Sequence, residues 1–168
     1  MSEAIAPTRL FQPRESGYRQ VSAHWWLTRD GDLQARALFE RHYSCSNHRP
    51  QNTQFVRPGE KMVLIGGDAE ALFVWRKERF RRDQQAGVNC AVFRNEGRYR
   101  SSDLIREASE LAVTRWPGER LFTFVNASAI RISNPGCCFK RAGWRLCGKS
   151  QAGLLILERC ATPISAIA

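Results

Sequence analysis

The chain has 168 residues, of which 43% are hydrophobic, and a formal net charge of +10. This length suits a single domain with one core, and an ordinary hydrophobic fraction argues against extended disorder. The sequence contains no run of about 18 apolar residues, and its first residues lack the apolar core of a signal peptide. We therefore expect a cytoplasmic protein without a membrane partner. The basic excess favours contact with DNA or another polyanion.

The first part of the chain predicts an arm followed by a short helix. Residues 1–20 have no sustained periodicity, which indicates a flexible basic arm before a domain over residues 21–168. From Asp32 the apolar spacing predicts a helix that is capped by Asp30 or Asp32 and ends near Tyr43. The six cysteines show no paired spacing, so we expect reduced thiols.

Apolar runs predict the strands. Residues 61–65 and 71–75 read as a β-hairpin, residues 88–93 as a buried strand, and residues 121–125 and 153–158 as two more strands. A helix follows the third run, with Ser102 as its N-cap and Asp103 in its first turn. Another helix starts with Asn134 as its N-cap. The order of elements predicts a mixed α/β (α+β) domain with one core.

The turn after the strand over residues 88–93 has the composition of a phosphate site. The first N–H groups of a helix have no internal partner, and the helix dipole favours an anion there. Arginines and serines surround this predicted helix start, namely Arg94, Arg98, Arg100, Ser101 and Ser102. An ordinary strand–helix connection with solvated arginines has the same pattern, so this alternative stays open.

Two motifs stand out, RNEG at residues 94–97 and NPGCCFKRAGW at residues 134–144. Together with the order of elements, they resemble the GNAT (Gcn5-related N-acetyltransferase) superfamily over roughly residues 60–158. The first motif resembles the opening of the family's pyrophosphate loop, and the second resembles its helix that ends in Y-x-x-x-G-F. Tyr99 stands where the family has a small residue. Phe139 stands where many members have a tyrosine that protonates the leaving thiolate.

The resemblance implies a GNAT-like single domain with a central twisted, mostly antiparallel sheet flanked by helices. It also implies a cofactor, acetyl-CoA or a related anionic donor. The residues that would hold this donor are Phe93, Arg94, Gly97, Arg98, Ser101, Ser102 and Asn134.

Within the superfamily, the chain is similar to bacteriophage Mom-type DNA-modification proteins. The similarity lies in His42 and Tyr43, in residues 90–93 (CAVF) and in the arginine-rich loop that follows. It implies modification of adenine N6 in DNA and evasion of restriction enzymes. An enzyme that reaches a base atom takes the base out of the stack and holds it between aromatic rings. The candidate rings are Tyr43, Trp75, Tyr99 and Trp144, although a ring of this kind is more often part of the core.

Three residues are the candidate catalytic groups. His42 and Tyr43 suit a general base and a proton donor, because histidine titrates near neutral pH. Asn126 follows the strand over residues 121–125, where the resemblance places two splayed strands that admit the acyl donor; capping a turn is its alternative role.

Other side chains have weaker chemical signals. The spacing of His42, Cys45 and His48 supplies metal-ligand types, but six residues of helix turn His48 away from the other two. We therefore predict a site without a metal and keep these three as an option. Cys137 and Cys138 near a helix start would have a lowered thiol pKa if they are exposed.

Our main hypothesis is a GNAT-like transferase that modifies DNA bases. One alternative is an acetyl-CoA-dependent N-acetyltransferase that acts on a small amine, a protein or transfer RNA. Another is a non-catalytic basic DNA-binding protein on a GNAT scaffold, with contacts from the clusters at residues 76–82 and 94–106. The sequence leaves the oligomeric state open, a homodimer included.

Overall fold

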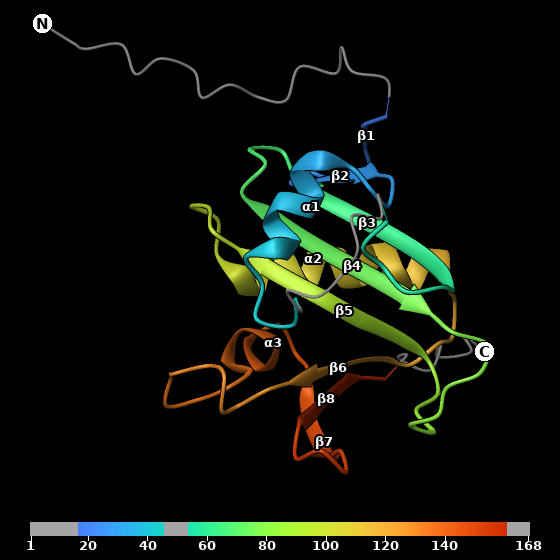
Figure 1. Cartoon of the computed structure of the whole chain (residues 1–168), viewed down its shortest axis with the longest axis vertical. Coiled ribbons are helices and arrows are strands. Elements are labelled where there is room, and N and C mark those ends of the chain that lie inside the picture. Colours follow the sequence, from blue (N-terminus) through green and yellow to red (C-terminus); the bar gives the residue numbers. More distant parts are fainter. Residues whose placement is uncertain (1–16, 46–53, 161–168) are drawn as a thin grey trace, which may run out of the picture.

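The computed structural model describes residues 17–45 and 54–160, which form one sheet with helices on both faces (Figure 1). The strands of the sheet are β1 (Arg19–Gln20), β2 (Trp25–Thr28), β3 (Glu60–Gly66), β4 (Ala71–Lys77), β5 (Val88–Asn95), β6 (Leu121–Val125), β7 (Arg145–Lys149) and β8 (Leu155–Arg159). The helices are α1 (Leu33–Glu40), α2 (Ser101–Arg115) and α3 (Cys137–Arg141). The prediction of a mixed α/β domain is thus confirmed.

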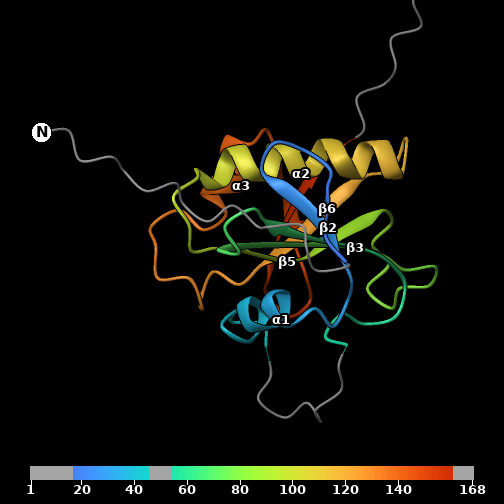
Figure 2. The same ribbon diagram turned by 90° about the horizontal axis from the view of Figure 1, so that it is seen from above.

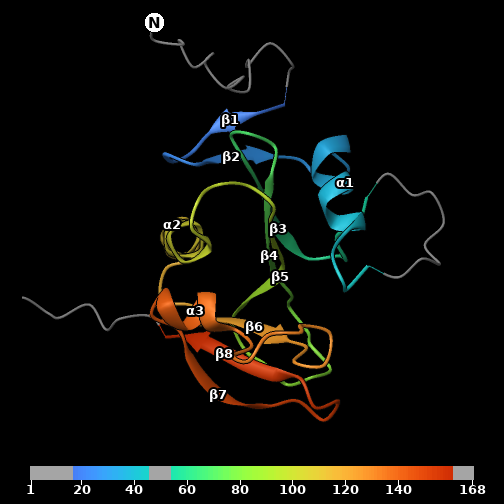
Figure 3. The ribbon, with the colours of Figure 1, turned by 90° about the vertical axis from the view of Figure 1, so that its left-hand side faces the viewer.

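The sheet is antiparallel except at one place. Its strand order is β1-β2-β3-β4-β5-β6-β8-β7, and only β5 and β6 run parallel. The crossover between these two strands contains α2, as a parallel connection requires. Figures 2 and 3 show α1 on one face of the sheet, with α2 and α3 on the other.

Each face of the sheet has its own hydrophobic core, because alternate strand residues point to opposite sides. Along β4, Phe73 and Trp75 pack toward α2, whereas Leu72 and Val74 pack toward α1. The indole N–H of Trp75 donates to the carbonyl of Ala108 in α2 at 3.0 Å. This bond satisfies the polar atom of a fully buried ring and ties the long helix to the sheet.

The parallel strands β5 and β6 separate soon after they meet. Their pairing runs only from Val88 opposite Leu121 to Cys90 opposite Thr123. Beside it, the register between β4 and β5 shifts, so that Ala91 is an extra residue in β5. A bulge of this kind bends its strand. The later part of β5 therefore diverges from β6 (Figure 1).

Helix boundaries differ from three of our predictions. The carboxylate of Asp32 accepts from the N–H groups of Gln34 and Ala35, so its capping role is confirmed, but α1 ends at Glu40. Ser102 is a buried residue of the first turn of α2, and the N-cap is Arg100. Asn134 is not a cap either, as described below with α3.

Helix α3 begins later than predicted, because Gly136 is its N-cap. Gly136 has a φ of 76°, a left-handed conformation that suits glycine. A side chain there would also meet Leu157, since its Cβ would lie 2.6 Å from Leu157 Cδ1. The chain therefore reverses at Gly136, and Asn134 and Pro135 precede the helix.

Strands β1, β2 and β7 were not predicted. All five residues of β7 are exposed, so this edge strand lacks the apolar alternation that marks a half-buried strand. Arg19 and Gln20 belong to the sheet, although we predicted an arm up to residue 20; residues 1–16 lie outside the described part. No helix within residues 17–45 and 54–160 is long and apolar enough to span a bilayer.

Candidate functional site

The turn after α1 is fixed above the diverging end of β5. Arg41 forms two hydrogen bonds with the carboxylate of Glu96, at 2.7 and 2.8 Å. The same carboxylate pairs with Arg94, which also donates to the carbonyl of Arg41. These bonds from Arg41 and Arg94 lower the pKa of Glu96 to about 2. An ionised carboxylate thus holds residues 41–44 in place at neutral pH.

His42 is held as a neutral imidazole. Burial, reinforced by the charge of Arg94, lowers its pKa to about 4, and a hydrogen bond to the Phe93 carbonyl only partly opposes this. The backbone N–H of Ser44 donates to Nδ1 at 3.2 Å, and the Ser44 hydroxyl lies 2.7 Å from the same atom. Nδ1 is therefore the acceptor, which leaves the Nε2 proton for Phe93.

Tyr43 lies beside His42, with their ring centroids 4.3 Å apart. Tyr43 is partly exposed to solvent. Its hydroxyl receives a hydrogen bond from the backbone N–H of Asn126. Burial of the hydroxyl raises the pKa of Tyr43. At neutral pH the phenol therefore keeps its proton and remains able to donate it.

The structure brings together the three predicted catalytic residues, in different roles. Asn126 meets Tyr43 through its backbone, since its side-chain oxygen accepts from the N–H groups of Ser128 and Ala129. The side chain of Asn126 therefore caps the turn after β6. The meeting point of His42, Tyr43 and Asn126 spans the ends of β5 and β6.

Around the start of α2, the predicted donor loop is closed by its own contacts. The Asn95 amide donates to the Tyr99 carbonyl and the Ser101 hydroxyl, at 2.7 and 3.0 Å, and accepts from the N–H of Gly97. On the other side of Gly97, an added Cβ would lie 3.0 Å from Asp68 Oδ2. Carboxylate oxygens of Asp68 and Glu70 thus lie close beside this glycine.

The remaining predicted donor residues do not converge on the start of α2. Arg94 turns toward the α1 turn, and Arg98 lies over the Tyr99 ring, 5.1 Å from its centroid. Phe93 packs beside the ring of buried Phe139 in the α2 core. The Asn134 side chain accepts from Lys140. Of the predicted donor residues, Gly97, Ser101 and Ser102 are left at the start of α2.

Several other predicted residues are part of the core. Trp75 and Trp144 are buried and stack on each other, with their ring centroids 6.1 Å apart, so neither can hold an extruded base. All six cysteines are free thiols, as predicted. The pKa of Cys138 is raised by burial, so the condition of exposure on which its predicted activation depended is not met.

The optional metal site of His42, Cys45 and His48 lies partly outside the described residues. His48 lies outside the described residues, and within them no group of three histidine, cysteine, aspartate or glutamate side chains has metal-binding geometry.

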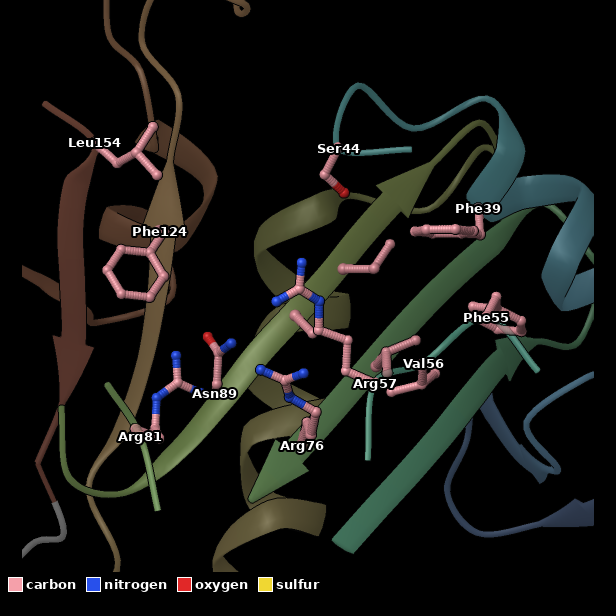
Figure 4. Close-up of a pocket in the computed structure, with 13 residues that line it drawn as sticks. Phe39, Ser44, Phe55, Val56, Arg57, Arg76, Arg81, Asn89, Phe124 and Leu154 are labelled. Carbon is pink, nitrogen blue, oxygen red and sulfur yellow. The ribbon is translucent and has the colours of Figure 1, made fainter. Parts of the chain in front are cut away.

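A cavity of about 400 Å³ opens on the α1 face beside this site, where β5 and β6 diverge. Ser44 lines one end of it, and Phe124 of β6 lies across from β5 (Figure 4). The other end is polar, with the side chains of Arg57, Arg76, Arg81 and Asn89. Sequence reasoning missed Arg57, Asn89 and Ser44, and it did not place Arg76 and Arg81 in a cavity. The signal was present in Arg76 and Asn89, polar residues within apolar strands.

Two of these arginines belong to a cluster that we expected to contact DNA. The side chains of Arg76 and Arg81 are each only 9% exposed. Both line the cavity, so they do not present a surface to a duplex.

Comparison with protein-family models, curated proteins and solved structures found no match to this chain.

Proposed function

We propose that this protein is a GNAT-like transferase that modifies adenine in DNA. One observation carries the proposal. His42 is hydrogen-bonded to Phe93 in β5, and Tyr43 is hydrogen-bonded to Asn126 at the end of the parallel strand β6. The resemblance to GNAT proteins places the acyl donor between such strands. Here the strands diverge beyond Cys90, and a histidine and a tyrosine lie at that divergence.

The proposed reaction is transfer from an acyl thioester, such as acetyl-CoA or a related anionic donor, to the exocyclic nitrogen N6. This nitrogen bonds to the donor's carbonyl carbon, and the carbon–sulfur bond breaks. The proton lost by nitrogen passes through the Ser44 hydroxyl to Nδ1 of His42, which lies 2.7 Å away. Tyr43 protonates the leaving thiolate and regains its proton from His42.

The protonation states suit a weakly nucleophilic amine. Once its nitrogen has attacked, such an amine becomes strongly acidic, so a base with a pKa of about 4 is sufficient to accept its proton. Tyr43 has the proton that Phe139 lacks, and it supplies the step for which many GNAT proteins use a tyrosine at the Phe139 position.

DNA as the partner is supported by the net charge of +10 and by an exposed basic edge strand. Strand β7 contains Arg145 and Lys149, and all its residues are open to solvent, although Arg145 also pairs with Glu158 at 2.8 Å. Basic groups of this kind bind phosphates with release of counterions. Tyr43, at 46% exposure, is the candidate ring for holding an extruded base.

The direct test is restriction protection. Plasmid DNA from cells that express the protein should resist restriction enzymes that cut at adenine-containing sites. DNA from cells that express a Tyr43→Phe variant should be cut normally. Equal cleavage of both DNAs and of DNA from control cells would count against base modification.

A second candidate function is a non-catalytic basic DNA-binding protein. The observation that favours it is the carboxylate of Asp68 beside Gly97, together with the bonds of Asn95 that close the donor loop. Calorimetry with acetyl-CoA distinguishes the transferase from the non-catalytic protein. Absence of binding, together with unmodified DNA and salt-sensitive DNA binding, would favour this second function.

A further inference from the structure

The polar end of the cavity contains buried atoms without partners. Arg76 and Asn89 are only 7% and 6% exposed. Among the described residues, Nε of Arg76 and Oδ1 of Asn89 have no hydrogen-bond partner, and Nη1 of Arg81 has only an ion pair with Glu78 at 3.3 Å. A buried polar group without a partner is costly, so such groups rarely remain unsatisfied in a working protein. Two of them, Nε of Arg76 and Oδ1 of Asn89, lie at one end of a cavity and indicate a ligand.

The charge at this end is positive. Arg76 pairs with Glu78 at 2.8 Å, and Arg81 pairs with Asp83 and, at 3.3 Å, with the same Glu78. Arg57 has neither a hydrogen-bond nor an ion-pair partner in residues 17–45 and 54–160. Three guanidinium groups thus face two carboxylates, and one positive charge remains. Burial, with the nearby charges of Arg81 and Arg57, lowers the pKa of Arg76 despite Glu78, so an anion here would relieve an unfavourable arrangement.

The side chains converge on one space. Figure 4 shows the guanidinium groups of Arg57 and Arg76 and the amide of Asn89 over the same part of β5. Arg81 approaches from the loop after β4 and is held there by the Phe122 ring, 5.0 Å from its guanidinium carbon. Its position is therefore set before any ligand arrives.

We propose that this cavity binds a nucleotide, with its phosphate between Arg57, Arg76 and Arg81. Several guanidinium groups that approach from different elements match the spread oxygens of a phosphate. The unpaired Oδ1 of Asn89 needs a hydrogen-bond donor, which a base or sugar supplies and inorganic phosphate at neutral pH supplies poorly. A volume of about 400 Å³ suits a ligand of nucleotide size.

The nucleotide has two possible sources, a free nucleotide or one taken out of DNA. The DNA source rests on the proposed function. Because Ser44 lines the same cavity, a phosphate at the arginine end would orient the base toward the proton relay of Ser44 and His42. Phe124 then faces the ligand from β6.

The test is calorimetric titration of the full chain with dAMP and with deoxyadenosine, in the absence of any acyl donor. Arg57→Gln is the main variant. Arg57 forms no hydrogen bond or ion pair with another described residue, so we expect this variant to fold normally. Arg82→Gln is the matched control, since Arg82 is exposed on the loop after β4 and does not line this cavity.

We expect dAMP to bind at least tenfold more tightly than deoxyadenosine. Arg57→Gln should weaken dAMP binding about tenfold or more, and Arg82→Gln should change it less than about twofold. Equal affinity for dAMP and deoxyadenosine, or equal effects of the two variants, would overturn the proposal.

A short duplex with one unpaired adenosine distinguishes the sources. If Arg57→Gln weakens both duplex and dAMP binding far more than Arg82→Gln does, DNA supplies the nucleotide; if it weakens dAMP binding alone, the ligand is a free nucleotide. Both outcomes support a phosphate site. If base modification is absent but dAMP binding depends on Arg57, this inference stands and the proposed function fails. If base modification occurs but dAMP binding does not depend on Arg57, only this inference fails.

Discussion

The hydroxyl of Tyr43 receives a hydrogen bond from the backbone N–H of Asn126. This bond joins the turn after α1 to the end of β6, two segments far apart in the chain. Because His42 beside it binds the carbonyl of Phe93 in β5, the two side chains connect both diverging strands. The proposed chemistry depends on this connection.

Removal of the Tyr43 hydroxyl should abolish proton donation to the leaving group. We expect Tyr43→Phe to lower the rate of base modification by about 100-fold or more, in the range typical of general acid catalysis. The phenyl ring retains its packing against His42, so the melting temperature should change little. Tyr99→Phe, which removes a hydroxyl beside Arg98, is the matched control. Equal rates for the two variants would exclude Tyr43 as the acid.

The Ser44 hydroxyl should act as a proton relay. Ser44→Ala should reduce the rate by about tenfold or more, whereas Ser44→Thr, which retains a hydroxyl, should restore most of it. Single-turnover kinetics with a defined duplex would measure both. A threonine variant as slow as the alanine variant would indicate that Ser44 only shapes the turn.

Acid should destabilise the folded protein through His42. Its pKa is about 4 when folded and near 6.5 when unfolded, so below pH 6.5 the unfolded chain binds a proton that the folded chain does not. This contribution to stability is present above pH 6.5 and is lost as the pH falls toward 4. Urea unfolding should therefore show a smaller loss over this interval for His42→Gln than for the natural chain. Identical pH dependence would contradict a buried, neutral His42.

Gly87 should be intolerant of a side chain. Its φ is 115°, and an added Cβ would lie 2.1 Å from the carbonyl oxygen of Arg120, at the point where β5 begins to pair with β6. We expect Gly87→Ala to lower the free energy of unfolding by about 2–3 kcal/mol. Gly148→Ala in β7, where no atom lies within 4 Å of an added Cβ, should change it by less than about 0.5 kcal/mol. Similar losses in urea unfolding would refute this close approach.

DNA binding should depend steeply on salt. If about six phosphates are contacted, affinity should fall roughly 10³-fold between 50 and 200 mM salt. Fluorescence anisotropy with a labelled duplex would measure the slope. An affinity that hardly changes with salt would argue against the basic surface as the DNA contact.

The elements that were predicted correctly have strong local signals. The Asp32 cap and the apolar runs of β3, β4 and β5 depend on neighbouring residues, and these predictions were confirmed. The Asn134 cap failed because the left-handed backbone at Gly136 is imposed by packing against Leu157, a residue distant in sequence. Local patterns cannot report such contacts.

The site was predictable only in part for the same reason. His42, Tyr43 and Asn126 were singled out by type and position, but their junction depends on the carboxylate of Glu96 and on the bulge in β5. The arginine end of the cavity is formed by side chains from two loops, β4 and β5. Its members look like ordinary charged residues until the sheet brings them together.

Nucleoside mass spectrometry tests the central claim most directly. DNA is isolated from cells that express the natural chain, the Tyr43→Phe variant or neither, then digested to nucleosides. We predict a new adenine-derived mass only with the natural chain, at the expense of deoxyadenosine. Identical nucleosides in all three samples, with both proteins folded and bound to DNA, would contradict the assignment of this protein as a DNA-modifying transferase.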